Sequence, residues 1–152
     1  MEKVAPHAHL TVVSRFESIE LVLAVVDDLL KQAELNGETR HWVGLAVREA
    51  IANAVKHGSR EEEERIRVEA TVEDGEVIVR VRDKGPGFDP DELSDPLAPE
   101  NLLRPSGRGI FYMRKLMDDV EFRFDDDRGT EVVLRKQISS EEDFARTEED
   151  TG

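Results

Sequence analysis

Cysteine is absent from the 152 residues, and its absence removes several classes of chemistry. A disulfide framework, a cysteine-ligated metal and a cysteine nucleophile are excluded, and nothing suggests an oxidising compartment. Long hydrophobic runs are absent too, because no stretch approaches the roughly 18 consecutive apolar residues of a membrane-spanning helix. The amino terminus has no apolar segment of signal-peptide length. We therefore expect a cytoplasmic protein with no membrane partner.

Positive charge is scarce, since 21 Lys and Arg face 35 Asp and Glu and leave a net charge of −14. Proteins bind nucleic acid backbones and anionic membranes by placing Lys and Arg on phosphates, so an acidic average field disfavours both partners. Direct binding of nucleic acid is not expected. A chain of this length fits one compact domain, and we look for one active site.

Hydrophobic periodicity predicts a strand, two helices, a hairpin, a third helix and a second hairpin. Asp74-Gly75 is the predicted turn of the first hairpin, and Thr39 the predicted N-cap of the second helix. This order favours an α+β fold, a two-layer sandwich with helices on one face of a mixed, mainly antiparallel sheet. The predicted ranges are 9–14, 18–35, 39–58, 65–72, 76–82, 109–117, 120–124 and 130–136.

Two segments fall outside this pattern. Residues 88–106 have no convincing period and contain four prolines, and because long loops in small domains are usually functional or disordered, we interpret this one as a lid. The acidic end is too polar to bury. We therefore predict one domain over residues 1–137 and a flexible tail over residues 138–152.

The second predicted helix carries the first candidate site. Glu49 and Asn53 are four residues apart and project from nearly the same helix face. Apolar residues surround them, and asparagine is a mediocre helix former whose amide needs hydrogen-bond partners. A polar ligand would supply these partners, although an isolated pair of this kind is more often part of the solvent-facing stripe of an amphipathic helix.

Two further candidates follow strands. Asp83 begins the segment Asp83-Lys84-Gly85-Pro86-Gly87, where a fixed carboxylate can accept a hydrogen bond from an exocyclic amine such as that of adenine. Gly129-Thr130 stands between the last two strands, where the hydroxyl can reach a buried ligand. Taken alone, the first segment is better explained as a plain β-turn and the second as an ordinary hairpin.

The fourth candidate opens the third helix. Ser106-Gly107-Arg108-Gly109 combines free backbone N–H groups, the positive end of a helix dipole and a guanidinium. Phosphate binding uses these features, although a glycine-rich match alone has many false positives.

In this order and spacing, the four candidates resemble the N, G1, G2 and terminal boxes of the GHKL superfamily of histidine-kinase-like ATPases. The resemblance covers about residues 8–137. Within the superfamily, the segments 47–58 and 107–118 are similar to those of the anti-sigma factor serine/threonine kinases.

The resemblance implies a Bergerat-type ATP-binding fold with ATP and Mg²⁺ as cofactors. It implies that Asn53 binds Mg²⁺, that Asp83 recognises the adenine amine with support from Thr130, and that Glu49 accepts a proton from the attacking hydroxyl. The remaining implied nucleotide-binding residues are Gly85 and Gly87 around the pocket, and Arg104, Gly107, Arg108 and Gly109 near the phosphates.

The implied function is that of an ATP-dependent serine/threonine protein kinase acting as an anti-sigma factor in a partner-switching pathway. It would phosphorylate a STAS-type anti-anti-sigma protein, sequester a sigma factor and form a homodimer. Two alternatives stay open. One is a nucleotide-gated protein-binding regulator without kinase activity, and the other is a slow stand-alone ATPase in which water is the acceptor.

Overall fold

The computed structural model of the chain describes residues 5–58, 64–84, 105–125, 129–138 and 144. The order of elements is the predicted one: strand, two helices, hairpin, helix and hairpin. The elements are β1 (His7–Val13), α1 (Ser18–Gln32), α2 (Gly37–Gly58), β2 (Arg65–Glu73), β3 (Glu76–Asp83), α3 (Pro105–Leu116), β4 (Asp119–Asp125) and β5 (Gly129–Gln137).

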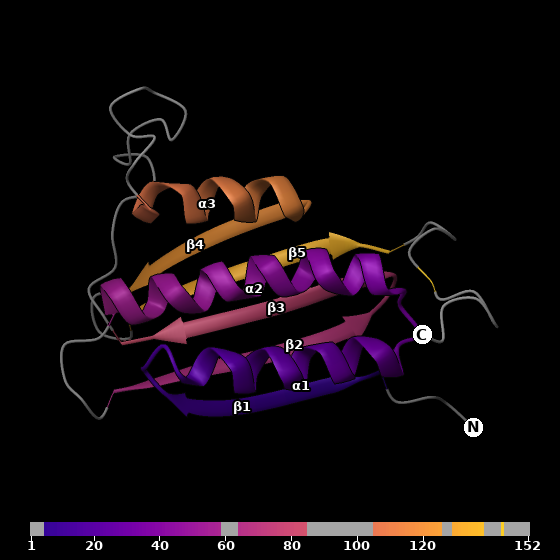
Figure 1. Cartoon of the computed structure of the whole chain (residues 1–152), viewed down its shortest axis with the longest axis horizontal. Coiled ribbons are helices and arrows are strands. Elements are labelled where there is room, and N and C mark those ends of the chain that lie inside the picture. Colours follow the sequence, from indigo (N-terminus) through magenta and orange to yellow (C-terminus); the bar gives the residue numbers. More distant parts are fainter. Residues whose placement is uncertain (1–4, 59–63, 85–104, 126–128, 139–143, 145–152) are drawn as a thin grey trace.

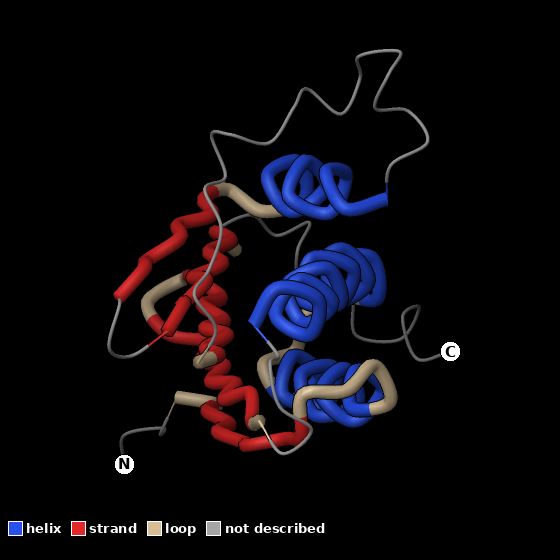
Figure 2. The backbone as a smooth tube through the Cα atoms, turned by 90° about the vertical axis from the view of Figure 1, so that its left-hand side faces the viewer, coloured by secondary structure: helices blue, strands red, loops and turns tan. Residues whose placement is uncertain are grey.

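The five strands form one sheet in the order β1-β2-β3-β5-β4. All four neighbouring pairs are antiparallel, so no parallel pair occurs among the described strands. The three helices lie side by side on one face of the sheet, and its other face carries no described helix (Figures 1 and 2). The predicted two-layer α+β fold with helices on one face is confirmed.

The core lies between the sheet and the helices. Along β2, Ile66, Val68 and Ala70 are buried, and their neighbours point to the open face, because side chains alternate along a strand. On α2, Val43 and Val47 are fully buried at helical spacing. Burial of these apolar faces holds α1 and α2 on the sheet.

None of the helices in the described ranges is long and apolar enough to cross a membrane.

The junction between α1 and α2 differs from the prediction. α1 ends at Gln32, where the N–H groups of Glu34 and Leu35 bond to the carbonyls of Lys31 and Leu30 in a Schellman arrangement. The N-cap of α2 is Asn36, whose Oδ1 accepts a hydrogen bond of 2.8 Å from the Thr39 N–H. The prediction of Thr39 as N-cap was wrong, because an asparagine before glycine can start a helix as well as end one.

α3 begins at Pro105, four residues before the predicted start at Gly109. Proline suits the first position of a helix because its φ is already helical and its missing N–H would have no partner there. The last residues of the predicted lid therefore belong to α3. The rest of that segment, residues 88–104, lies outside the described residues.

The first hairpin matches its prediction. Asp74 and Gly75 have φ values of 54° and 72°, and they connect Glu73 to its cross-strand partner Glu76. Two central residues with positive φ are typical of the type I′ turn, which suits the twist of antiparallel strands. Asp74-Gly75 thus fixes the β2–β3 register.

The chain keeps contact with the domain beyond β5. Ile138 is buried, and its N–H donates a 2.9 Å hydrogen bond to the Gly75 carbonyl. Phe144 forms an isolated antiparallel bridge with Leu35, at the junction of α1 and α2. These contacts join the end of the described chain to two earlier turns.

Candidate functional site

Glu49 and Asn53 meet α3 at a glycine. A Cβ atom added to Gly109 would lie 2.8 Å from Oε2 of Glu49 and 3.6 Å from both amide atoms of Asn53. The absence of a side chain at Gly109 therefore lets α3 approach these two polar groups. The structure thus joins two of the four motifs that the sequence places about 60 residues apart.

Asn53 is buried and has an orphaned polar atom. Its residue is 6% exposed, and Nδ2 has no hydrogen-bond partner among the described residues. Buried polar groups are nearly always paired in native proteins, so an orphaned amide indicates a position where something polar binds. Rotation about the last side-chain bond exchanges Nδ2 with Oδ1, so the amide can present a donor or an acceptor there.

Asp83 and Thr130 form a second polar pair, on the sheet. They are direct cross-strand partners at the ends of β3 and β5, and both are buried. The Thr130 hydroxyl has no partner among the described residues. A carboxylate and a free hydroxyl thus lie side by side at the ends of two central strands. The carboxylate can accept a hydrogen bond from a ligand, and the hydroxyl can donate one to the same ligand.

Gly129 makes this pairing possible. Its φ is 97°, and a Cβ atom there would lie 1.9 Å from the carbonyl oxygen of Asp83. Only glycine adopts this conformation at so short a distance. The sequence pattern indicated Gly129 as a turn residue but did not predict its close approach to Asp83, because that approach depends on the β3–β5 register.

The other predicted site residues are described less fully. Gly107 and Arg108 lie in the first turn of α3, and the description of Arg108 does not extend to its side chain. Gly85, Gly87 and Arg104 lie outside the described residues. The described part of the site therefore comprises Glu49, Asn53, Asp83, Gly109 and Thr130.

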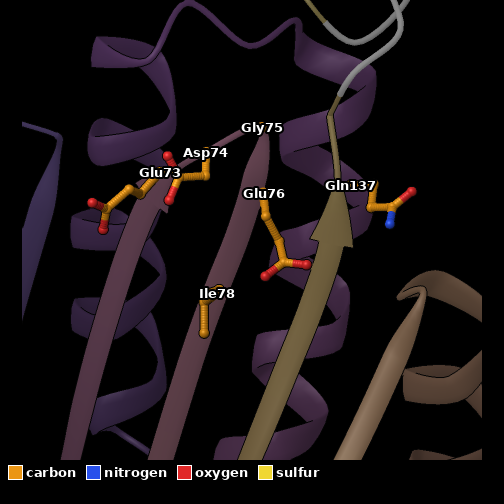
Figure 3. A pocket seen from close by; sticks show the side chains of 6 residues that line it. All are labelled: Glu73, Asp74, Gly75, Glu76, Ile78 and Gln137. Carbon is orange, nitrogen blue, oxygen red and sulfur yellow. The ribbon is translucent and has the colours of Figure 1, made fainter.

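A hollow of about 390 Å³ lies at the opposite end of β3 from Asp83, around the first hairpin turn. Figure 3 shows the carboxylates of Glu73, Asp74 and Glu76 there, with Ile78 and Gln137. No group of three or more metal-binding side chains occurs among the residues that the structure describes, this hollow included. Its acidic lining does not suit a nucleotide phosphate.

Residues 12–136 match the model of a family described as the histidine kinase-like ATPase domain. The chain belongs to this family. The matched range contains all of the predicted site residues, so the predicted GHKL superfamily is confirmed.

Curated relatives agree with the predicted subgroup. Serine-protein kinase RsbW of Listeria monocytogenes serovar 1/2a is 31% identical over 133 residues, which cover 83% of each chain. The anti-sigma F factor of Clostridium acetobutylicum is 27% identical over 140 residues, covering 90% of this chain and 87% of its own. The prediction of the anti-sigma serine/threonine kinase subgroup is confirmed.

A solved structure is similar in fold. The RsbU and RsbW domains of a protein from Mycobacterium tuberculosis superpose with a TM-score of 0.67 at 20% identity. The match covers 93% of this chain but only 35% of the other chain. This likeness supports the fold alone.

Proposed function

We propose that the chain is an ATP-dependent serine/threonine protein kinase that acts as an anti-sigma factor in a partner-switching pathway. Relatives that are a serine-protein kinase and an anti-sigma factor support this function, and the ATPase family supports ATP as the nucleotide. The observation that carries the proposal is the contact at Gly109, where α3 meets Glu49 and Asn53 one turn after its start. Helix starts favour phosphate, so a phosphate at the first turn of α3 would lie close to both side chains.

The residues present fit a magnesium ion. Mg²⁺ prefers oxygen ligands and keeps several waters, so one protein amide oxygen suffices when nucleotide phosphates supply others. Asn53 would hold the ion, because its amide is buried and half of it lacks a partner. When bound, Mg²⁺ neutralises charge on the β- and γ-phosphates.

Glu49 would act as the general base. Its carboxylate lies one helical turn before Asn53 and next to Gly109. It would accept the proton of a serine hydroxyl while that oxygen forms a bond to the γ-phosphorus. The bond between the γ-phosphorus and the bridging oxygen breaks, and ADP leaves with that oxygen. The product is a phosphoserine on the partner protein.

Residues on the sheet would recognise the adenine base of ATP. The Asp83 carboxylate would accept a hydrogen bond from the exocyclic amine of adenine, and the Thr130 hydroxyl would complete the contact directly or through water. The orphaned state of that hydroxyl supports this role. The residues proposed to shape the pocket or face the phosphates are Gly85, Gly87, Arg104, Gly107, Arg108 and Gly109.

We also propose protein partners and a cellular location. The acceptor would be a STAS-domain anti-anti-sigma protein, and the sequestered partner a sigma factor, so that the kinase regulates transcription without touching nucleic acid. We propose a cytoplasmic homodimer, with residues 1–137 as the kinase domain and residues 138–152 as its tail. The net charge of −14 supports protein partners over nucleic acid.

Phosphotransfer tests this function. The purified chain is incubated with Mg²⁺, γ-labelled ATP and STAS-domain proteins encoded nearby, and label on a serine or threonine is measured. Glu49→Gln should abolish transfer and leave ATP binding in place, while Glu17→Gln, outside the site, should transfer normally. Tight ATP binding without transfer to any candidate would favour a nucleotide-gated regulator, and phosphate release without a partner would favour an ATPase.

A further inference from the structure

The face of the sheet opposite the helices carries no described helix (Figure 2). A hollow lined by charged side chains lies on this face. Cross-strand register places Thr11, Arg67, Arg82, Glu131 and Arg123 in one row across five strands. The neighbouring row on the same face runs from His9 through Glu69 and Arg80. The hollow, about 180 Å³ in volume, lies between these rows and is lined by His9, Arg67, Glu69, Arg80, Arg82 and Glu131, which we call the arginine hollow.

Two of its arginines face each other. Arg67 and Arg82 are direct cross-strand partners, and like charges in such positions repel. Arg82 is bonded to Glu131 at 3.1 Å, and the same carboxylate also accepts a bond of 3.3 Å from Arg123. The Arg67 side chain has no hydrogen bond or ion pair with any described residue. The repulsion between Arg67 and Arg82 is therefore only partly offset by the protein itself.

The third arginine has an orphaned nitrogen. Nε of Arg80 is buried and has no partner among the described residues, although Glu69 is its direct cross-strand neighbour. The Glu69 carboxylate lies 3.9 Å from Nε2 of His7, in the row beyond the hollow. A buried donor on a charged group is expensive to leave unpaired. The nearby carboxylates thus leave the Arg67 side chain and Nε of Arg80 without a hydrogen-bond partner among the described residues.

We propose that the arginine hollow binds a phosphate group. Guanidinium groups bind oxyanions through pairs of parallel hydrogen bonds. Phosphate presents its oxygens in several directions, so one phosphate can bond to more than one of the three arginines that line the hollow. Phosphate between Arg67 and Arg82 would relieve their repulsion and give Nε of Arg80 an acceptor. The hollow is small, so it suits one phosphate group rather than an extended chain.

This site is separate from the nucleotide site. Glu49, Asn53 and Gly109 lie on helices that cover the other face of the sheet (Figure 2). The arginine hollow is therefore independent of the proposed kinase activity, and loss of either one leaves the other testable. It is also unusual in this chain, because three guanidiniums gather around two carboxylates in a protein of net charge −14.

Inorganic phosphate is the probe, titrated into the ¹⁵N-labelled full chain while the arginine Nε–Hε signals are followed by NMR. Potassium chloride at equal ionic strength is the blank. We expect saturable shifts of the Arg80 and Arg67 signals, and apparent affinity at least about tenfold weaker in Arg67→Gln and Arg80→Gln. Arg65→Gln is the matched control on the same strand, since Arg65 is exposed and outside the hollow.

Arg67 is exposed, so Arg67→Gln keeps the test valid if Arg80→Gln fails to fold. A phosphoserine peptide is titrated in parallel. The same shifts at lower peptide concentration assign the phosphate to a protein-borne group, and stronger binding of inorganic phosphate assigns it to the free ion. Shifts no larger than those in chloride would overturn the proposal. Shifts that depend on protein concentration would overturn it too, because they would show that a second copy of the chain binds this face.

Discussion

The two ends of β3 carry the same residue types and do different things. At one end, Asp74 and Gly75 form a tight turn in which both residues are exposed, and a Cβ atom on Gly75 would meet nothing within 4 Å. At the other end, Asp83 is buried beside Thr130, and Gly129 is pressed against the Asp83 backbone. Aspartate and glycine therefore do not identify a site by themselves. Burial and an orphaned hydroxyl distinguish the end that we propose as the nucleotide site from the end that forms only a turn.

Gly129→Ala should have the largest effect on stability. The added Cβ would lie 1.9 Å from the Asp83 carbonyl oxygen in a conformation with φ of 97°, so we expect a loss of roughly 2 to 6 kcal/mol in the free energy of unfolding. Gly75→Ala is the matched variant at the other end, and should lose only about 1 kcal/mol through its positive φ. Urea unfolding measures both, and equal losses would show that the two glycines play the same part.

Gly109→Ala should act on catalysis more than on stability. A Cβ atom 2.8 Å from Oε2 of Glu49 would displace the end of that flexible side chain, and misplacing a catalytic group by about 1 Å can lower the rate by roughly 10²-fold. Gly44→Ala is the control on α2, where a Cβ atom meets nothing within 4 Å. Its rate should stay normal, and its stability should rise slightly because alanine favours helices. Comparable rates of labelled phosphate transfer in the two variants would remove Gly109 from the site.

Thr130→Val should separate binding from folding. The hydroxyl lost is already without a partner, so the ligand-free chain should be as stable as the parent or up to about 2 kcal/mol more stable. Its affinity for ATP should fall. Thr71→Val is the contrast, because the Thr71 hydroxyl is hydrogen-bonded to His7 at 2.9 Å and its removal should not stabilise the chain. Thermal unfolding with and without ATP checks both, and a destabilised ligand-free Thr130→Val would mean that the hydroxyl has a structural partner.

The smallest effect is expected on the open face of the sheet, at Arg123→Ala. The hydrogen bond from Arg123 lowers the pKa of the Glu121 carboxyl, so the pair stabilises the fold above the ordinary glutamate pKa and loses that contribution as pH falls through the lowered value. The variant should return the Glu121 pKa toward its usual range. NMR titration of the carboxyl checks this, and an unchanged pKa would assign the shift to other groups.

The order of elements and the Asp74-Gly75 turn could be predicted because they depend on local pattern and on backbone φ preferences. The boundaries at Asn36 and Pro105 were predicted wrongly, because asparagine before glycine and proline after a loop each suit both the start and the interruption of a helix. These errors are local and do not move the site.

The candidate site was predictable as four motifs in order, but not as a geometry. Periodicity places Asn53 on a helix, yet its orphaned amide depends on what α3 brings near it. The pairing of Asp83 with Thr130 depends on a register set across residues 84–129. The arginine hollow gave no sequence signal, because its residues alternate with core residues on β2 and β3 and resemble any solvent-facing positions.

The most direct test exchanges one aspartate at each end of β3 and measures ATP binding by calorimetry in the presence of Mg²⁺. Asp83→Asn replaces an acceptor with an amide, and loss of one charge-assisted hydrogen bond should weaken ATP binding by roughly 10- to 100-fold. Asp74→Asn should bind ATP like the parent chain, because Asp74 lies in the turn at the far end. Equal affinities in the two variants would contradict the assignment of the Asp83 end as the nucleotide site.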